Sequence, residues 1–427
     1  MESRCLCKAL HIIMQEGWDQ KMKAIKCGSL FCAVDESVQN DMVILIEENT
    51  IKEVKKASEA GDLSGLEVID LSNAFVLPGL IDCHTHINMN GEPDNMGEFP
   101  FITIGTVALR SIKNAQASLM GGFTTLRDMG AMGFTDVAVR DAINSGLHWG
   151  PRLLCSGMSI GATAGHADDH FNPYMHNEQP FAQVVDGVDA AIKAARYTIK
   201  HGADVVKIMA TGGVMSKNDE PGAPDFSYEE MKAIIDVAKT RGKTIAAHAH
   251  GYTGIKDAVR AGITSIEHGM ILDDEAIDMM AEAGTYLVPT IIAAYNIVAN
   301  GVAAGIPEWG VRKGEQVLKT HEAGFQKCID KGVKIAFGCD TATPFNPHGQ
   351  QAREFGLMVK FGMAPVKTLL SATSVASDLI RMADKLGTIE AGKLADIVAV
   401  PGNPVDDITV MEKVCFVMKD GVVYKEA

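Results

Sequence analysis

The sequence lacks several features that would assign it to other classes of protein. No apolar run reaches the about 18 residues that a membrane-spanning helix needs, so no membrane partner is predicted. The nine cysteines form no Cys-x-x-Cys pair, and such an odd, scattered set indicates reduced thiols rather than a disulfide framework. Basic residues are few, because 39 lysines and arginines stand against 54 acidic residues, for a formal net charge of −15. This balance argues against a nucleic-acid partner, which requires a basic face.

The N-terminal residues 1–21 also lack the marks of a secretory signal, since they contain acids and show no small-residue cleavage site. Met22 begins the stretch "MKAIKCGSLF", which is a better start for a domain, so we expect residues 1–21 to be an N-terminal extension. Together with the reduced cysteines, this favours a cytoplasmic protein. No Pro/Gly/Ser-rich linker divides the rest, and 427 residues suit one large α/β barrel with a smaller domain.

What the sequence has is a repeated unit, in which a helix-like segment ends at a glycine and a short apolar run follows. Six glycines stand at this junction: Gly122, Gly202, Gly242, Gly262, Gly284 and Gly332. Glycine just past a helix end adopts the left-handed conformation that other residues resist. Adding the runs at 75–86 and 150–157 gives eight expected strands. Alternation of helices with continuously apolar strands predicts a parallel sheet, and eight units indicate a (β/α)8 TIM barrel over residues 78–384.

The segments that flank the expected barrel have a different pattern. Residues 22–77 and 385–427 contain short alternating strands, and neither segment has enough apolar residues for a core of its own. We therefore expect both chain ends to combine in one small β-sandwich. Within the barrel region, Ser227 and Glu230 form the pattern of a capping box, which predicts that a helix begins there. The predicted fold class is α/β, a TIM barrel with a β-sandwich domain.

Polar residues interrupt the apolar runs where strands of the expected barrel end. They are His84, His86, Lys207, His248, His268 and Asp340. A single histidine near a strand end is more often structural, and Asp340 alone could cap a helix. A lysine inside a buried strand is rarer, because desolvation of an ammonium group is costly. Barrel enzymes carry their chemistry at the carboxyl ends of the strands, so the whole set indicates one site at one mouth of the barrel.

These residues carry a resemblance to the amidohydrolase superfamily of metal-dependent hydrolases. The matching stretches are "PGLIDCHTH", the lysine and histidines above, "GCD" and the closing "GTIEAGKLADIVAV", which together cover nearly the whole chain after residue 22. The stretches "ATGGVMSKND", "IAAHAHGYTGIKDAVRAGITSIEHG" and "FVMKDGVVYK" resemble a bacterial group known as Xaa-Pro dipeptidases or imidazolonepropionases. That group includes metal carboxypeptidases acting on dipeptides and N-acyl amino acids, and is similar to ochratoxin-hydrolysing amidases.

The resemblance implies a site for two divalent metal ions, usually Zn²⁺, which suits imidazole and carboxylate ligands. The two histidines of the first strand would bind the more buried ion, and His248 and His268 the other. Lys207 would carry a carbamate formed with carbon dioxide and bridge the ions. Asp340 would bind the buried ion, take the proton of the attacking hydroxide and deliver it to the leaving amine.

The resemblance and the loop sequences also suggest residues that contact the substrate. His166, in "GATAGHADDH", matches the position of a loop histidine in the group and is a candidate donor to the oxyanion. His250 shares a strand face with His248 and, with Tyr252 and Lys217, is a candidate for substrate binding. The acids at 168–169 and 219–220 would suit a substrate with a basic C-terminal residue such as Arg or Lys, although a charge run is usually a solvated face.

The predicted function is a binuclear-metal hydrolase that releases a C-terminal amino acid from dipeptides or N-acyl amino acids, including ochratoxin-like amides. The alternative is a cyclic amide or C–N hydrolase, such as imidazolonepropionase or a deaminase. Those sites typically use one metal and lack the strand lysine, so Lys207 discriminates between the two. A binding protein with a vestigial site is a third possibility. The expected partner is a small-molecule amide or dipeptide, and a homo-oligomer is expected only by analogy with the family.

Other residues near the site are interpreted as structural. Arg127 and Asp128 are expected to form a structural pair at the barrel mouth, and Cys83 and Cys339 to pack away from the metals. The 22 methionines are interpreted as filling the apolar core.

Overall fold

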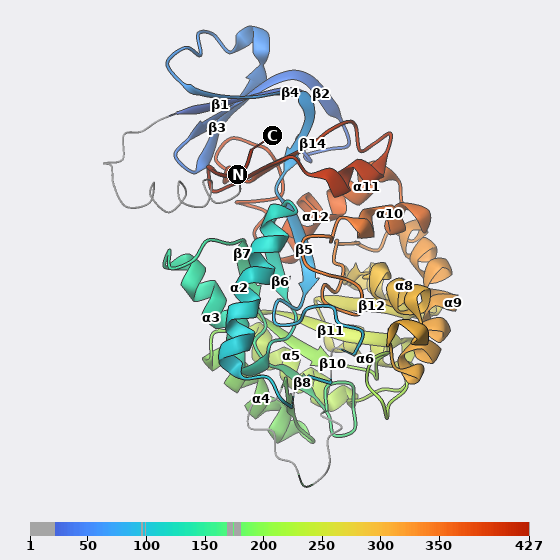
Figure 1. Cartoon of the computed structure of the whole chain (residues 1–427). Coiled ribbons are helices and arrows are strands. Elements are labelled where there is room, and N and C mark those ends of the chain that lie inside the picture. The colour runs from blue at the N-terminus through green and yellow to red at the C-terminus, as the bar shows by residue number, and fades with distance from the viewer. Residues whose placement is uncertain (1–21, 95–96, 99, 169–173, 175–180, 427) are drawn as a thin grey trace.

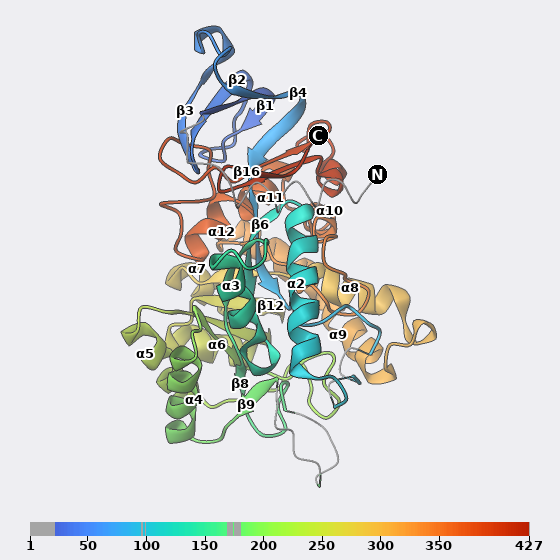
Figure 2. The same cartoon turned by 60° about the vertical axis from the view of Figure 1, so that its left-hand side comes forward.

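The computed structural model describes residues 22–94, 97–98, 100–168, 174 and 181–426, so the predicted N-terminal extension lies outside the described residues. Figure 1 shows a sheet formed by both chain ends, joined through β4 and β5 to the part that contains the remaining strands and most of the helices. In Figure 2, turned by 60°, strands β1 to β4 lie at one end of the molecule and helices α4 and α5 lie near the other.

The sheet of the chain ends has seven strands in the order β16-β15-β14-β4-β1-β2-β3. Its strands are β1 (Lys23–Phe31), β2 (Val38–Glu47), β3 (Thr50–Lys56), β4 (Glu67–Pro78), β14 (Ile397–Val400), β15 (Phe416–Lys419) and β16 (Val422–Lys425). The two ends meet where β14 pairs antiparallel with β4, with Ile397 opposite Pro78. The expected two-layer sandwich is not confirmed, because these strands pair edge to edge in one sheet. The predicted domain boundaries stay a prediction.

The parallel strands predicted for the middle of the chain are confirmed, in two sheets. One sheet contains β5 (Leu80–Thr85), β6 (Phe123–Asp128) and β7 (Arg152–Cys155). The other, in the order β13-β12-β11-β10-β8-β9, contains β8 (Ser159–Gly161), β9 (Ala182–Val184), β10 (Val205–Met209), β11 (Thr244–Gly251), β12 (Ser265–Ile271) and β13 (Tyr286–Val288). Every residue of β10 and β11 is buried, as expected for parallel strands covered on both faces.

The strands of the described residues do not close into one barrel, so the predicted closed cylinder is only partly confirmed. The run at 333–340, expected as the eighth strand, joins its neighbours by isolated bridges, Leu287 with Ile335 and Thr85 with Thr341. The backbone leaves the extended conformation at the end of this run, because φ is 53° at Asp340. On the other side, β7 approaches the residue before β10, because the Asp204 amide donates a hydrogen bond of 2.7 Å to the Cys155 carbonyl.

Helices alternate with these strands along the chain. They are α2 (Ile104–Met120), α3 (Thr135–Asn144), α4 (Val188–Lys200), α5 (Tyr228–Thr240), α6 (Tyr252–Ala261), α7 (Asp274–Ala283), α8 (Ile291–Asn300), α9 (Glu308–Asp330), α10 (Arg353–Lys360), α11 (Pro365–Ser371) and α12 (Ser374–Leu379). Short 3-10 helices cover Ala57–Glu59, Met132–Phe134, Val302–Ala304 and Ile408–Lys413. Among the described helices, none is long and apolar enough to cross a bilayer.

The local signals read from the sequence are confirmed at the helix ends. The glycines predicted to follow helices all have positive φ, and Gly262 and Gly284 cap α6 and α7 in the left-handed conformation. Helix α5 begins with the predicted capping box, in which Ser227 and Glu230 exchange hydrogen bonds. The glycine that ends each helix fixes where the next strand begins. It therefore also determines which residues lie at the carboxyl end of that strand.

Candidate metal and active site

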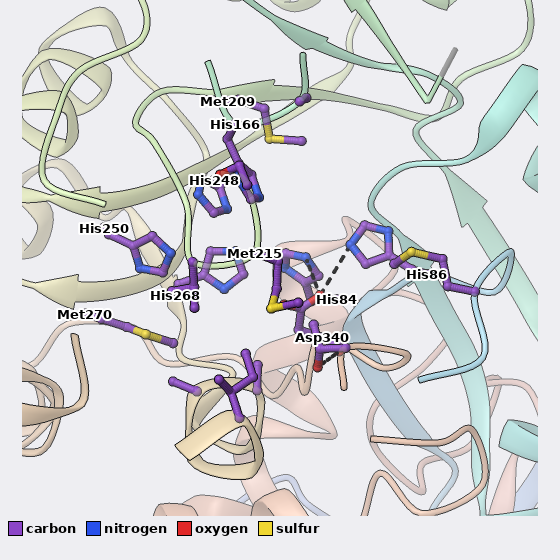
Figure 3. Close-up of a pocket in the computed structure, with 18 of the residues that line it drawn as sticks. His84, His86, His166, Met209, Met215, His248, His250, His268, Met270 and Asp340 are labelled. Atoms are coloured by element: carbon purple, nitrogen blue, oxygen red, sulfur yellow. Dashed lines mark hydrogen bonds and ion pairs between the residues drawn. The ribbon is translucent and has the colours of Figure 1, made fainter. Parts of the chain in front are cut away.

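A cavity that is partly open to solvent lies beside the carboxyl-terminal halves of the parallel strands. Figure 3 shows histidines from several strands directed toward one another in it, with Asp340 beside His84 and His86. Its wall contains all the residues predicted as metal ligands: His84, His86, Lys207, His248, His268 and Asp340. The fold thus brings together side chains from β5, β10, β11, β12 and the run that ends at residue 340.

The imidazoles are closely packed around the Asp340 carboxylate. The ring centroids lie 4.9 Å apart for His84 and His268, and 4.6 Å apart for His248 and His268. The Oδ1 atom of Asp340 lies 3.3 Å from Nε2 of His86 and 3.5 Å from Nε2 of His84. His84, His268 and Asp340 offer ligand atoms that all lie within 4.8 Å of one another. This donor set of imidazole nitrogen and carboxylate oxygen fits a divalent metal ion.

The outer hydrogen bonds of the histidines fix which nitrogen is free to bind a metal. His86 Nδ1 lies 3.1 Å from the Gly130 carbonyl, and His248 Nε2 lies 3.3 Å from the Gly212 carbonyl. A carbonyl oxygen only accepts hydrogen bonds, so each of these nitrogens carries the hydrogen and the other nitrogen of the ring keeps its lone pair. The chain therefore orients its ligands as metal sites in proteins require.

His84 is oriented by a buried carboxylate that sequence reasoning missed. Its Nδ1 lies 2.8 Å from Oε2 of Glu267, and Oε1 of Glu267 accepts a hydrogen bond of 2.8 Å from Arg127. Burial acts to raise the pKa of Glu267, but the Arg127 charge and the His84 hydrogen bond outweigh it and lower the pKa to about 2. The expected pairing of Arg127 with Asp128 is therefore wrong, because the guanidinium pairs with Glu267 of β12. The signal in the sequence was the acid within the apolar run "SIEHG".

Lys207 projects from β10 into the same cavity and is 1% exposed. Burial lowers the pKa of its ammonium group to about 8, although the Glu267 and Asp340 carboxylates act in the opposite direction. A larger fraction of this lysine is therefore an uncharged amine near neutral pH than of an exposed lysine.

Two of the predicted substrate contacts line the cavity. The His166 ring stacks on His248 with centroids 4.1 Å apart, and its Nδ1 lies 2.8 Å from Oγ of Ser216. The centroids of the His250 and His268 rings lie 5.1 Å apart. The Nδ1 atom of His250 is buried, and it has no hydrogen-bond partner among the described residues. Both rings extend the cluster of imidazoles beyond the predicted ligands.

The other two predicted substrate contacts lie outside the cavity wall. Lys217 is exposed, with its Nζ 5.4 Å from the centroid of the Trp309 ring. Tyr252 begins α6 and is 45% exposed, with Lys256 over its ring. Neither residue lines this cavity, and their contact with a substrate stays a prediction.

Apart from Ser216 and Thr343, the rest of the cavity wall is apolar and includes four methionines: Met89, Met209, Met215 and Met270. Phe181, Val214, Ala293, Ala294 and Ile297 also line it. All four belong to buried apolar clusters or pack against one, as the interpretation of the methionines as core residues expected, but their place in the cavity wall was not predicted. Met209 stands two residues after Lys207 on β10, so side-chain alternation could have identified it.

Acids expected to attract a basic substrate form ion pairs with residues of α9 instead. Asp219 accepts a hydrogen bond of 2.7 Å from Lys313, and Glu220 accepts one of 2.7 Å from Arg312. Neither carboxylate lines the cavity, nor does that of Asp168, and Asp169 lies outside the described residues. The structure therefore does not support the expected preference for a basic C-terminal residue.

Cys83 and Cys339 are both fully buried beside the predicted ligands. The Sγ atom of Cys339 lies 2.8 Å from Oδ2 of Asp82, and neither cysteine lines the cavity. Their interpretation as packing residues is consistent with this placement.

Comparison with known proteins gives a consistent result. A family model described as "Amidohydrolase family" matches residues 75–424. Ochratoxinase of Aspergillus niger is 33% identical over 377 residues, which cover 82% of this chain and 75% of that protein. Imidazolonepropionase of Fusobacterium nucleatum subsp. nucleatum is 25% identical, covering 85% of each chain. A crystal structure of a Xaa-Pro dipeptidase with bound methionine in the active site is 38% identical, with a TM-score of 0.87, and covers 95% of this chain and 100% of that one.

Proposed function

This chain belongs to the amidohydrolase family, a family of hydrolases that act on C–N bonds, and from that premise we propose that it is a binuclear-metal hydrolase of small amides. It would release the C-terminal amino acid of a dipeptide or an N-acyl amino acid. The observation that carries the proposal is the presence of Lys207 in one cavity with the ligand histidines and Asp340. The similarity to a Xaa-Pro dipeptidase and to ochratoxinase supports an amide substrate.

In this proposal, two divalent ions are held by the residues of the cavity wall. His84 and His86 would share one ion with Asp340, whose Oδ1 lies between 3.3 and 3.5 Å from their Nε2 atoms. His248 and His268 would hold the second ion. Nitrogen and carboxylate ligands of this kind favour Zn²⁺.

Lys207 would bridge the two ions after reaction with carbon dioxide. The uncharged amine attacks the carbon of carbon dioxide, a proton is released, and a carbamate anion results. The lowered pKa of Lys207 increases the fraction of reactive amine, and burial disfavours the ammonium form that would otherwise remain. An anionic bridge would also balance part of the positive charge of the two ions.

Asp340 would move the proton of the reaction. When bound, the ions would supply Lewis acidity that activates water and polarises the amide carbonyl. Burial acts to raise the pKa of the Asp340 carboxyl, but His84, His86 and Lys207 outweigh it and lower the pKa to about 2, so this group is a carboxylate near neutral pH. Its oxygen can therefore take a proton from the attacking water and pass it to the leaving amine.

The apolar wall supports an apolar side chain on the released amino acid. The cavity is lined by methionines, Phe181 and small aliphatic residues, and among its lining residues Asp340 is the one carboxylate. Burial of an apolar side chain against such a wall contributes about 1.5–3 kcal/mol. The relative with methionine bound in its active site agrees with a substrate of this class.

The experiment that tests the proposal combines metal analysis with a substrate library. Protein prepared with Zn²⁺ and bicarbonate is expected to hold about two zinc ions per chain and to release amino acids from dipeptides and N-acyl amino acids. If the protein holds about one zinc ion per chain and hydrolyses cyclic amides instead, the imidazolonepropionase alternative is favoured. The similarity to that enzyme is the reason to test it. Absence of bound metal and of any hydrolysis would reject both.

A further inference from the structure

A buried lysine near His166 donates all three of its ammonium hydrogens to one loop. Lys313 of α9 is fully buried, and its Nζ donates to the carbonyls of Gly213 and Ser216, at 3.1 and 2.8 Å, and to Oδ1 of Asp219, at 2.7 Å. An ammonium group has three hydrogens, so this set satisfies it completely. The lysine therefore ties the loop at 213–219 to α9 and holds Asp219 as its counter-ion.

Asp219 in turn determines the direction of the Ser216 hydroxyl. The Oγ atom of Ser216 lies 2.6 Å from both oxygens of Asp219, and the Gly213 amide donates to Oδ2 at 2.8 Å. A carboxylate paired with a lysine only accepts hydrogen bonds. The single hydrogen of the Ser216 hydroxyl must therefore point to Asp219.

The ring of His166 must then act as the donor to Ser216. Its Nδ1 lies 2.8 Å from Oγ of Ser216, and the hydroxyl hydrogen is already committed to Asp219. Nδ1 therefore carries a hydrogen, and in the uncharged ring Nε2 keeps a lone pair. The stack on His248 and the hydrogen bond of 2.9 Å from the His166 amide to Asp225 hold the residue in place.

We propose that Lys313, Asp219 and Ser216 are positioning residues that fix His166 in the Nδ1–H form, so that its Nε2 accepts a hydrogen bond from an N–H group of the substrate. The N–H group would be that of the scissile amide or that of a free amino group. This assignment rests on the proposed amide hydrolysis. It differs from the oxyanion donor expected from the sequence, because an uncharged ring in this form has no hydrogen at Nε2.

The tautomer is tested without reference to activity, by ¹⁵N NMR of the full zinc-loaded protein labelled at histidine. The His166 signal is assigned by its loss in His166→Gln. We expect a protonated Nδ1 and an unprotonated Nε2 in the wild type and in Ser216→Thr, and loss of this preference in Ser216→Ala. Arg312→Gln is the matched control, because Arg312 neighbours Lys313 but pairs with the exposed Glu220. A protonated Nε2 in the wild type would overturn the proposal.

The substrate partner is tested with two pairs of compounds. One pair is an N-acyl amino acid and its N-methylated amide, and the other is a dipeptide and its analogue without the amino group. Loss of the recognised N–H is expected to lower kcat/KM about tenfold in the wild type and in Ser216→Thr, and to have little effect in Ser216→Ala. A penalty in the first pair identifies the scissile N–H, and one in the second identifies the amine.

Three further results separate this inference from the proposed function. Equal penalties in the wild type and Ser216→Ala for both pairs would overturn the inference, even with an active enzyme. Loss of zinc in Ser216→Ala would overturn it as well, because His166 would then act as a metal ligand. The expected tautomer in a wild type that hydrolyses no amide would support the positioning residues and reject the hydrolase.

Discussion

Glu267 and His84 form a hydrogen bond of 2.8 Å between side chains that are almost completely buried. The bond directs Nε2 of His84 toward Asp340, while Arg127 on the far side of the carboxylate balances its charge. One buried acid thus connects a structural ion pair with the orientation of a predicted metal ligand. Replacing it should affect stability and metal binding together.

We expect Glu267→Gln to lower zinc affinity about 10- to 100-fold, because His84 loses the anionic partner that orients it. It should also destabilise the fold by about 3–5 kcal/mol, because Arg127 keeps a buried charge without its counter-ion. Chelator competition and thermal unfolding measure the two effects. Asp278→Asn is the control, since it breaks only the exposed pair with Lys331 and should cost less than about 1 kcal/mol. Unchanged zinc affinity in Glu267→Gln would contradict the orienting role.

We expect Lys207→Ala to reduce bound zinc from about two ions per chain to about one and to abolish most activity, because the proposed bridge is removed. Added short-chain carboxylic acids should restore part of both, since a small carboxylate can occupy the space of the carbamate. Metal analysis and amino-acid release measure this outcome. Lys256→Ala, at a lysine paired with Asp273 and Glu275, should change neither. Full activity in Lys207→Ala would rule out the bridge.

We expect Met270→Ala to lower kcat/KM for substrates with a large apolar C-terminal residue by about 10- to 100-fold, because the side chain loses apolar contact worth about 1.5–3 kcal/mol. Substrates ending in arginine or lysine should be poor for both proteins, since the acids at 219–220 are paired away from the cavity. A dipeptide series differing only in its last residue measures this. Met382→Ala, which packs in a separate apolar cluster, is the control. A wild-type preference for basic residues would contradict the prediction.

We expect the stability contributed by Asp219 to depend on pH. Burial acts to raise the pKa of its carboxyl, but His166, Lys313, Ser216 and Gly213 outweigh it and lower the pKa below its ordinary value. A carboxyl with a lowered pKa in the folded state stabilises the fold above its unfolded pKa, and the contribution is lost as pH falls through the folded value.

This dependence is measured by comparing Asp219→Asn with the wild type. The variant should be less stable by about 3–5 kcal/mol at pH 7, because Lys313 is left without its counter-ion, and the difference should shrink as the pH is lowered from about 5 toward 2. Thermal unfolding at a series of pH values gives the difference. Asp236→Asn, in an exposed pair with Lys232, should show almost no such trend. A difference that grows toward low pH would contradict the assignment.

Features that depend on neighbouring residues could be predicted without knowledge of the fold. The glycines that follow helices, the capping box at Ser227 and the apolar strands were readable because helix ends and strand faces have short periods. The same periods placed the predicted ligands at the ends of their strands. Parallel strands carry their carboxyl ends to one edge, so these residues meet in one cavity although the strands of the described residues do not close into one barrel.

The distant residues that orient that site could be identified only from the folded chain. Glu267 is separated from His84 by 183 positions, and Lys313 from Asp219 by 94, so no local pattern links either pair. Lys217 and Tyr252 could not be placed from the sequence, because the direction of a loop or helix-end side chain depends on what packs around it. Local periodicity selects the faces of strands and helices. Burial of charge then requires a partner, and only the folded chain determines which residue supplies it.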